Sequence, residues 1–310
     1  MRRFLLFSLL CIAVGLQAQQ RNNVTSILEV LDIQTGQRTV LKEFNYLIEA
    51  PNWTRDGKWI YFNSGGLIYK IDPEGKGEVG LVDTQFVSKC NNDHILSFDG
   101  KWLAVSSSSN STTGWGSYVY VLPVEGGTPR LVTPYSPSYL HGWSPDGQTL
   151  AYCAFRSVAT GADIYTISVN GGEEKRLTTA EGLDDGPEYS PDGKHIWFNS
   201  VRTGLMQVWR MNADGSEQTQ MTFDETRNAW FPHVSPDGKQ VIYITYHVGD
   251  LEPGQHLANY NVELWLMPAA GGQPKRVAEL FGGQGTINTN SWAPDSRHVA
   301  FVSYRLNEKK

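Results

Sequence analysis

Six short segments spread along the chain share one pattern of hydrophobic positions. In each segment neighbouring residues are apolar, although a β-strand points them to opposite faces. Strands of this kind are covered on both sides, as in sheets that stack face to face. The six runs are 59–62, 102–105, 150–152, 196–198, 241–244 and 299–302. The pattern predicts six buried strands, each in a sheet packed between two neighbouring sheets.

A turn motif precedes each apolar run. Its clearest copies read Ser-Pro-Asp-Gly and begin at Ser144, Ser190 and Ser235. Proline presets the first central position of a type I turn, and glycine accepts the positive φ that follows. Aspartate is common to all copies, at Asp56, Asp99, Asp146, Asp192, Asp237 and Asp295. The copies lie about 45 residues apart, except for a longer last interval that indicates an insertion at 248–260.

Further strand-like units follow each motif, as at 163–167 and 207–211, and a Gly-rich turn leads to a short edge strand. Four strands per repeat are typical of a propeller blade. We therefore predict an all-β fold, a six-bladed β-propeller of four-stranded antiparallel blades. The last repeat stops near Tyr304, and residues 27–41 resemble its missing outer pair. We expect these N-terminal strands to complete the last blade and close the ring, with an open solenoid as the alternative.

The N-terminus has the features of a targeting segment. Arg2 and Arg3 precede an apolar run that is too short to span a membrane. We predict a cleaved signal peptide at 1–18, with an uncleaved anchor as the alternative. Residues 19–310 are then a single propeller domain, periplasmic or secreted.

Composition limits the classes of partner that the chain could bind. The net charge of −6 and the absence of a basic run argue against nucleic-acid binding. The mature chain has no second long apolar stretch, so we predict no membrane span in it. We also expect a monomer. The separation of Cys90 and Cys153 leaves a disulfide between them open.

The repeat also predicts which residues share one face of the ring. The start of the first strand and the end of the second strand of each repeat lie at the end opposite the Asp-Gly turns, which we interpret as structural. Arginine there can bind a carboxylate or phosphate, and aromatic rings can stack on a sugar. The alternative is that polar residues simply line a wet channel. The predicted ligand-binding face comprises Glu49, His94, Tyr139, His141, Arg156, Asp185, Glu188, Arg202, Trp230, His233, His247, Asn288, Asn290 and Arg305.

Three of these residues form a candidate metal site. His94, His141 and His233 come from different repeats, and three imidazoles with a vacant position would suit zinc or manganese. The alternative is that they donate hydrogen bonds to neighbouring strands.

The repeat that runs from Trp143 through Ser-Pro-Asp-Gly to Tyr152 resembles those of the TolB-like propeller family. Similar repeats occur in the propellers of dipeptidyl peptidase IV-type enzymes and oligogalacturonate lyases. The chain has no G-x-S-x-G motif, so serine peptidase chemistry is unsupported.

The resemblance implies a binding module in the cell envelope with a protein partner. It also supports the alternative, a β-eliminating lyase on oligosaccharides that contain uronates, with manganese held by channel histidines. In that reading Arg156, Arg202 or Arg305 would neutralise the uronate carboxylate, and His233 would remove the α-proton.

Overall fold

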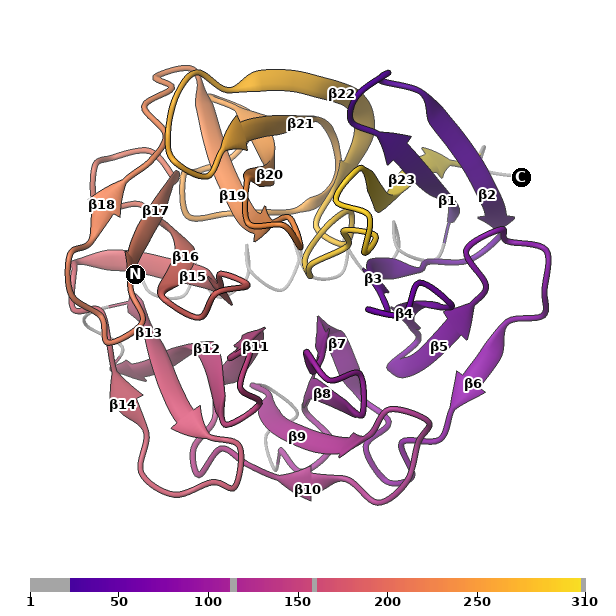
Figure 1. The fold of residues 1–310 in the computed structure, drawn as a ribbon, viewed down its shortest axis with the longest axis horizontal. Helices are drawn as coiled ribbons and strands as arrows, with labels where there is room; N and C mark the ends of the chain where they lie inside the picture. The colour runs from indigo at the N-terminus through magenta and orange to yellow at the C-terminus, as the bar shows by residue number, and fades with distance from the viewer. Residues whose placement is uncertain (1–22, 112–115, 158–160, 308–310) are drawn as a thin grey trace, which may run out of the picture.

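The computed structural model describes residues 23–111, 116–157 and 161–307, and the predicted signal peptide at 1–18 lies outside them. All regular elements of the described residues are β-strands, arranged as sheets around a common axis (Figure 1). No helix in these ranges is long and apolar enough to cross a membrane.

Hydrogen bonds join the strands into four small sheets and one large sheet. Three small sheets have four strands, and the first contains β3 (Glu49–Trp53), β4 (Ile60–Ser64), β5 (Leu67–Ile71) and β6 (Gly80–Val82). The second contains β7 (Cys90–Leu96), β8 (Trp102–Ser107), β9 (Tyr118–Pro123) and β10 (Arg130–Leu131). The third contains β19 (Arg227–Val234), β20 (Gln240–His247), β21 (Ala258–Pro268) and β22 (Lys275–Gly283). The fourth has three strands: β1 (Val24–Asp32), β2 (Arg38–Phe44) and β23 (His298–Leu306). The large sheet has eight strands: β11 (Ser138–Trp143), β12 (Thr149–Ser157), β13 (Gly161–Ser168), β14 (Lys175–Arg176), β15 (Gly182–Tyr189), β16 (His195–Ser200), β17 (Gln207–Asn212) and β18 (Thr219–Gln220).

The prediction of six four-stranded blades is therefore wrong. The fold is an all-β propeller, but β13 pairs in parallel with β15, which merges two expected blades into one sheet. The two sheets meet at Gly161 and Gly182, where the backbones approach so closely that a Cβ on Gly161 would lie 1.9 Å from the carbonyl oxygen of Gly182. Two glycines let the backbones approach more closely than side chains would permit. Spacing of turn motifs along the chain carries no signal for such lateral pairing.

The first and last strands close the ring, as the sequence predicted. β1 pairs antiparallel with β23 along its whole length, from Val24 opposite Leu306 to Asp32 opposite His298, and β2 lies outside β1. The expected innermost strand of this sheet is reduced to one bridge, between Trp292 and Val299.

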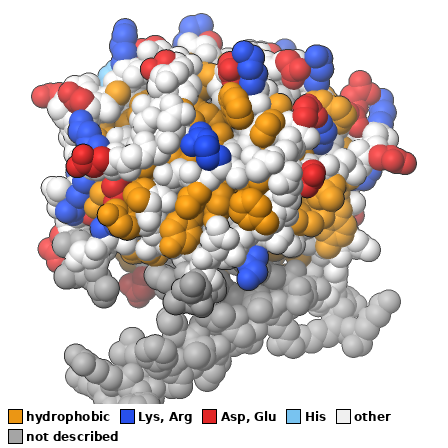
Figure 2. Space-filling view, turned by 90° about the horizontal axis from the view of Figure 1, so that it is seen from below, with side chains coloured by type: hydrophobic (Ala, Val, Ile, Leu, Met, Phe, Trp, Pro, Cys, Tyr) orange, Lys and Arg blue, Asp and Glu red, His pale blue; other side chains and the backbone are white. Residues whose placement is uncertain are grey.

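The core lies between neighbouring sheets. Leu28 of β1 and Val302 of β23 pack with Ile60 and Phe62 of β4, and all four side chains are buried. Apolar side chains are also visible on the outer rim, between charged ones (Figure 2). Because the sheets are covered on both faces, their strands carry the doubly apolar runs seen in the sequence.

The turn motif is built as predicted. Ser144 Oγ donates to Asp146 Oδ1 at 2.5 Å, and the Gly147 amide donates to the Ser144 carbonyl at 2.9 Å. Five of the six turns end an inner strand, and these inner strands, β3, β7, β11, β15 and β19, surround the axis (Figure 1).

The inner strands share a second local feature, a β-bulge. Their pairing with the next strand shifts register between Glu49 and Asn52 in β3 and between Asp185 and Glu188 in β15, and β7, β11 and β19 shift similarly. Ala50 and Phe231 lie in bulges with φ of 56° and 51°, a region that non-glycine residues rarely adopt. Bulges redirect side chains and often occur beside functional sites.

Candidate functional site

His141 lies at the bulge of β11, between two carboxylates. Its Nε2 atom is 3.4 Å from Asp185 Oδ1 and 3.7 Å from Asp93 Oδ1, and all three side chains are buried. Burial alone would lower the pKa of His141, but the two carboxylates outweigh it and raise the pKa to about 9. Burial raises the pKa of Asp93 to about 6. His141 is therefore an imidazolium at neutral pH.

Aromatic rings pack around this cluster. Phe231 stacks on the His141 ring with centroids 5.6 Å apart. His256, from the predicted insertion, lies 4.3 Å from the Trp230 ring and 5.1 Å from the Phe231 ring. Burial lowers the pKa of His256 to about 4, so that ring is neutral. The cluster is a packed polar core at the strand-start end of the axis.

A second polar cluster centres on Glu188. Its Oε2 atom bonds His233 Nδ1 at 2.6 Å, and its Oε1 atom accepts from the Val234 amide at 2.9 Å and from Asn290 Nδ2 at 2.7 Å. The other ring nitrogen of His233 bonds the Ile287 carbonyl at 2.5 Å. Both nitrogens of this histidine are thus occupied, and it has no free position as a base or a metal ligand.

The structure does not assemble the predicted metal site. Within the described ranges, no group of three or more His, Cys, Asp and Glu residues has a geometry that could hold a metal ion. His94 is buried apart, near the backbone of Ala50 and Tyr61 in the neighbouring sheet. Since His233 is committed to Glu188 and Ile287, the residues present do not fit a zinc or manganese ion.

The predicted arginines are each paired with a carboxylate. Arg156 pairs with Glu174 at 2.6 Å, Arg202 with Asp184 at 2.7 Å, and Arg305 with Glu43 at 2.7 Å. Asp184 belongs to the inner strand β15, and Arg156 also donates to the Pro137 carbonyl and to Ser138 Oγ at the start of the inner strand β11. Each of the three arginines is engaged by a carboxylate, and their sharing of a ligand-binding face with the histidines stays a prediction.

The remaining predicted residues have mixed surroundings. Glu49 accepts hydrogen bonds from Asn63 and Asn92, and Asn288 Oδ1 accepts one from the Gly285 amide. Tyr139 is half-buried against Phe155, and His247 is exposed. Cys90 and Cys153 are both buried and free, so they form no disulfide.

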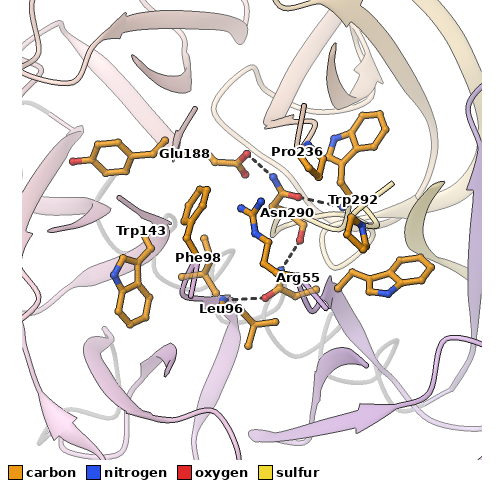
Figure 3. A pocket seen from close by; sticks show the side chains of 13 residues that line it. Arg55, Leu96, Phe98, Trp143, Glu188, Pro236, Asn290 and Trp292 are labelled. Atoms are coloured by element: carbon orange, nitrogen blue, oxygen red, sulfur yellow. Dashed lines mark hydrogen bonds between the residues drawn. The ribbon is translucent and has the colours of Figure 1, made fainter. Parts of the chain in front are cut away.

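Two predicted residues, Glu188 and Asn290, line a pocket at the opposite end of the axis whose other residues sequence reasoning missed. This turn-side pocket is lined by Asn52, Trp53, Arg55, Ile95, Leu96, Phe98, Trp143, Glu188, Tyr189, Pro236, Asn290, Trp292 and Pro294 (Figure 3). Arg55 points into it, and its guanidinium carbon lies 4.0 Å from the centre of the Phe98 ring. Asn290 links Glu188 to the Trp292 amide across the pocket. The interpretation of the turn end as purely structural is therefore incomplete.

A signal for this pocket was present in the sequence. The residues just before the turn aspartates are Arg55, Phe98, Pro145, Pro191, Pro236 and Pro294. Four are proline, which suits the turn, and the two exceptions are the pair that meets in the pocket. Departures from a structural repeat indicate a role other than building the turn.

Comparison with known proteins places the chain among TolB-like propellers. The sequence profile described as PD40, TolB beta propeller domain, matches residues 114–259. An uncharacterized protein of Agrobacterium fabrum is 43% identical over 91% of this chain and 93% of its own length. The Tol-Pal system protein TolB of Francisella tularensis is 27% identical over 68% of this chain, which spans 48% of that relative.

Solved structures agree with the sequence matches. The structure of a TolB candidate from Agrobacterium tumefaciens has 43% identity and a TM-score of 0.85, and the match covers 91% of this chain and 99% of that one. An oligogalacturonate lyase in complex with manganese has a TM-score of 0.51 and 13% identity over 75% of this chain and 66% of that one. At that identity the lyase shares the fold alone.

Proposed function

Since the chain belongs to the TolB-like β-propeller family, we propose that it is a binding module of the cell envelope that holds a protein partner at the turn-side end of its axis. The observation that carries this proposal is the turn-side pocket, in which the cation of Arg55 faces aromatic and proline side chains. Arginine and aromatic residues in a pocket are the groups that dominate protein–protein binding energy.

The other polar groups at the axis support binding rather than catalysis. Glu188, His233 and Asn290 bond one another, and His141 lies between two carboxylates. A lyase would need a free base beside a free cation that neutralises the uronate. His233 has both ring nitrogens bonded, and Arg156 is paired with Glu174, so these residues support the lyase alternative less well.

Envelope location rests on two kinds of support. Arg2 and Arg3, followed by the apolar run, have the character of an export signal. A relative named for the Tol-Pal system shares the propeller, although this chain spans about half of that protein. We propose an exported monomer whose partner is an envelope protein.

Site-directed photo-cross-linking tests the proposal. Phe98, at the pocket, is replaced by the photoreactive analogue p-benzoylphenylalanine, and the purified protein is irradiated with an envelope extract. Phe223, which is 73% exposed and follows the outer strand β18, provides a matched Phe position outside the pocket.

We expect one envelope protein, identified by mass spectrometry, to cross-link at position 98 and not at position 223. Equal labelling at both positions, or none at 98, would contradict the proposal. Unsaturated uronate product released from an oligogalacturonate, detected by ultraviolet absorbance, would favour the lyase instead.

A further inference from the structure

We infer that the turn-side pocket is a carboxylate subsite, in which Arg55 binds an acidic side chain or a chain terminus of the ligand. This inference names the chemistry of the ligand and rests on the proposed binding function. Four properties of the pocket support it: an uncommitted cation, a fixed seat for that cation, a small volume and a single positive charge.

Burial lowers the pKa of the Arg55 guanidinium and the charge of Glu188 in the same pocket partly offsets this, but the two side chains do not pair. In the described part of the chain, no hydrogen bond or ion pair involves this guanidinium, although Arg156, Arg202 and Arg227 all pair with carboxylates. Arg55 is only half-exposed, so its donors are partly withdrawn from water. Donors in such a place gain free energy from an anion that water alone would not supply.

Phe98 holds the guanidinium of Arg55 in place. The guanidinium lies over its ring at 4.0 Å, a cation–π contact that restricts the side chain and leaves the donor edge free. The two residues come from equivalent turns of adjacent sheets, where other repeats have proline. Arg55 and Phe98 thus occupy, at one place on the axis, the turn position that proline occupies in the other four repeats.

The size of the pocket selects a small group. Its free space is about 30 Å³, which is room for roughly two water molecules at about 10–15 Å³ each. The two oxygens of a carboxylate occupy such a space, and a sugar ring does not. A ligand must therefore insert one small end group and rest the remainder on the surrounding turns.

The charge of the pocket favours a monoanion. Arg55 is the one cation among its lining residues, and Glu188 is the one anion. The oxygens of Glu188 are already engaged by hydrogen bonds with Asn290, the Val234 amide and His233. A phosphate dianion would meet one positive charge and a neighbouring carboxylate, so a carboxylate fits better than a phosphate.

Titration with acetate tests the subsite. The Nε–Hε resonance of Arg55 is followed by NMR while the purified protein is titrated with acetate, with neutral acetamide and with inorganic phosphate. The variants are Arg55→Gln, Arg55→Lys and, as a matched control, Lys194→Gln. Lys194 is an exposed turn cation outside the pocket, 3.7 Å from Asp192.

We expect a saturable shift with acetate and none with acetamide. In the variants, shifts of the neighbouring backbone amides report binding. Arg55→Gln should weaken acetate binding about tenfold or more, the loss of one charge-assisted pair. Arg55→Lys should retain part of the affinity, and Lys194→Gln should retain all of it. Tighter binding of phosphate than of acetate, or no saturable shift, would overturn the inference.

Partner cross-linking separates this inference from the proposed function. If the envelope partner cross-links at position 98 equally in the wild type and in Arg55→Gln, the subsite is wrong and the binding function stands. If acetate binds Arg55 and no partner cross-links, the protein-binding function is wrong and the subsite stands.

Discussion

At the scale of single residues, the charge of His141 makes the stability of the fold depend on pH. Its pKa is raised from 6.5 to about 9, so its contribution to stability is complete below pH 6.5 and is lost as the pH rises through 9. We predict that the free energy of unfolding falls between these values by roughly 2–3 kcal/mol from this residue. In His141→Gln this fall of the unfolding free energy with pH should disappear, as measured by urea unfolding between pH 6.5 and pH 9. Equal slopes in both proteins would show that the carboxylates do not hold the charge.

Arg55 provides a second prediction, which separates stability from binding. The Gly57 amide donates to the Thr54 carbonyl at 3.0 Å, as the Gly147 amide does to Ser144 at 2.9 Å in a proline turn. Arg55→Pro should therefore fit the turn and raise the free energy of unfolding by about 0.4–1 kcal/mol while abolishing acetate binding. Denaturant unfolding and NMR titration measure the two effects. A destabilised variant would identify Arg55 as a structural residue.

Prediction from sequence succeeded where the determinants are local. Pro145, Asp146 and Gly147 form their turn with short-range hydrogen bonds, so their pattern predicts it directly. His141 and Asp185 are both predicted for one face of the ring, and their side chains lie 3.4 Å apart. The pairing of Arg156 with Glu174 was not predicted, because Glu174 belongs to an outer segment that the repeat does not position relative to β12.

At the scale of elements, β21 is held by a buried carboxylate. Glu263 is 2% exposed and accepts bonds from Arg227 at 2.5 Å, Arg276 at 2.7 Å and Trp265 at 2.9 Å. Burial would raise the pKa of Glu263, but the arginines outweigh it and lower the pKa to about 2.

Glu263→Gln should therefore destabilise the protein by about 1–3 kcal/mol at neutral pH. The contribution of Glu263 is present above pH 4.5 and is lost as the pH falls toward 2, so the two proteins should converge in acid. Thermal unfolding from pH 7 to pH 3 measures the difference. A constant gap over this range would contradict the assignment.

The bulges and the merged sheet were beyond sequence prediction. Phe231 adopts φ of 51° because the bulge of β19 requires it, and nothing in its residue type indicates this. The parallel pairing of Gly161 with Gly182 depends on how two repeats meet in space. Both features arise from tertiary packing, which overrides local preference.

At the scale of the whole molecule, closure of the ring depends on β1. Leu28 is fully buried there and faces β4 and β23. Leu28→Ala should cost about 2–5 kcal/mol, since a cavity opens at the joint between the two ends of the chain. Val40→Ala in β2, where the side chain is 54% exposed, should change stability by less than about 0.5 kcal/mol. Chemical denaturation compares the two, and similar small effects would show that closure contributes little.

The axis of the ring differs at its two ends. The strand-start end contains the buried His141 between Asp93 and Asp185, and the turn end contains Arg55 beside a small open pocket. A crystal structure of the protein with acetate tests this difference most directly. The account predicts acetate oxygens within hydrogen-bond distance of the Arg55 guanidinium, with Phe98 beneath it. An Arg55 paired with Glu188 and no acetate in the turn-side pocket would contradict it.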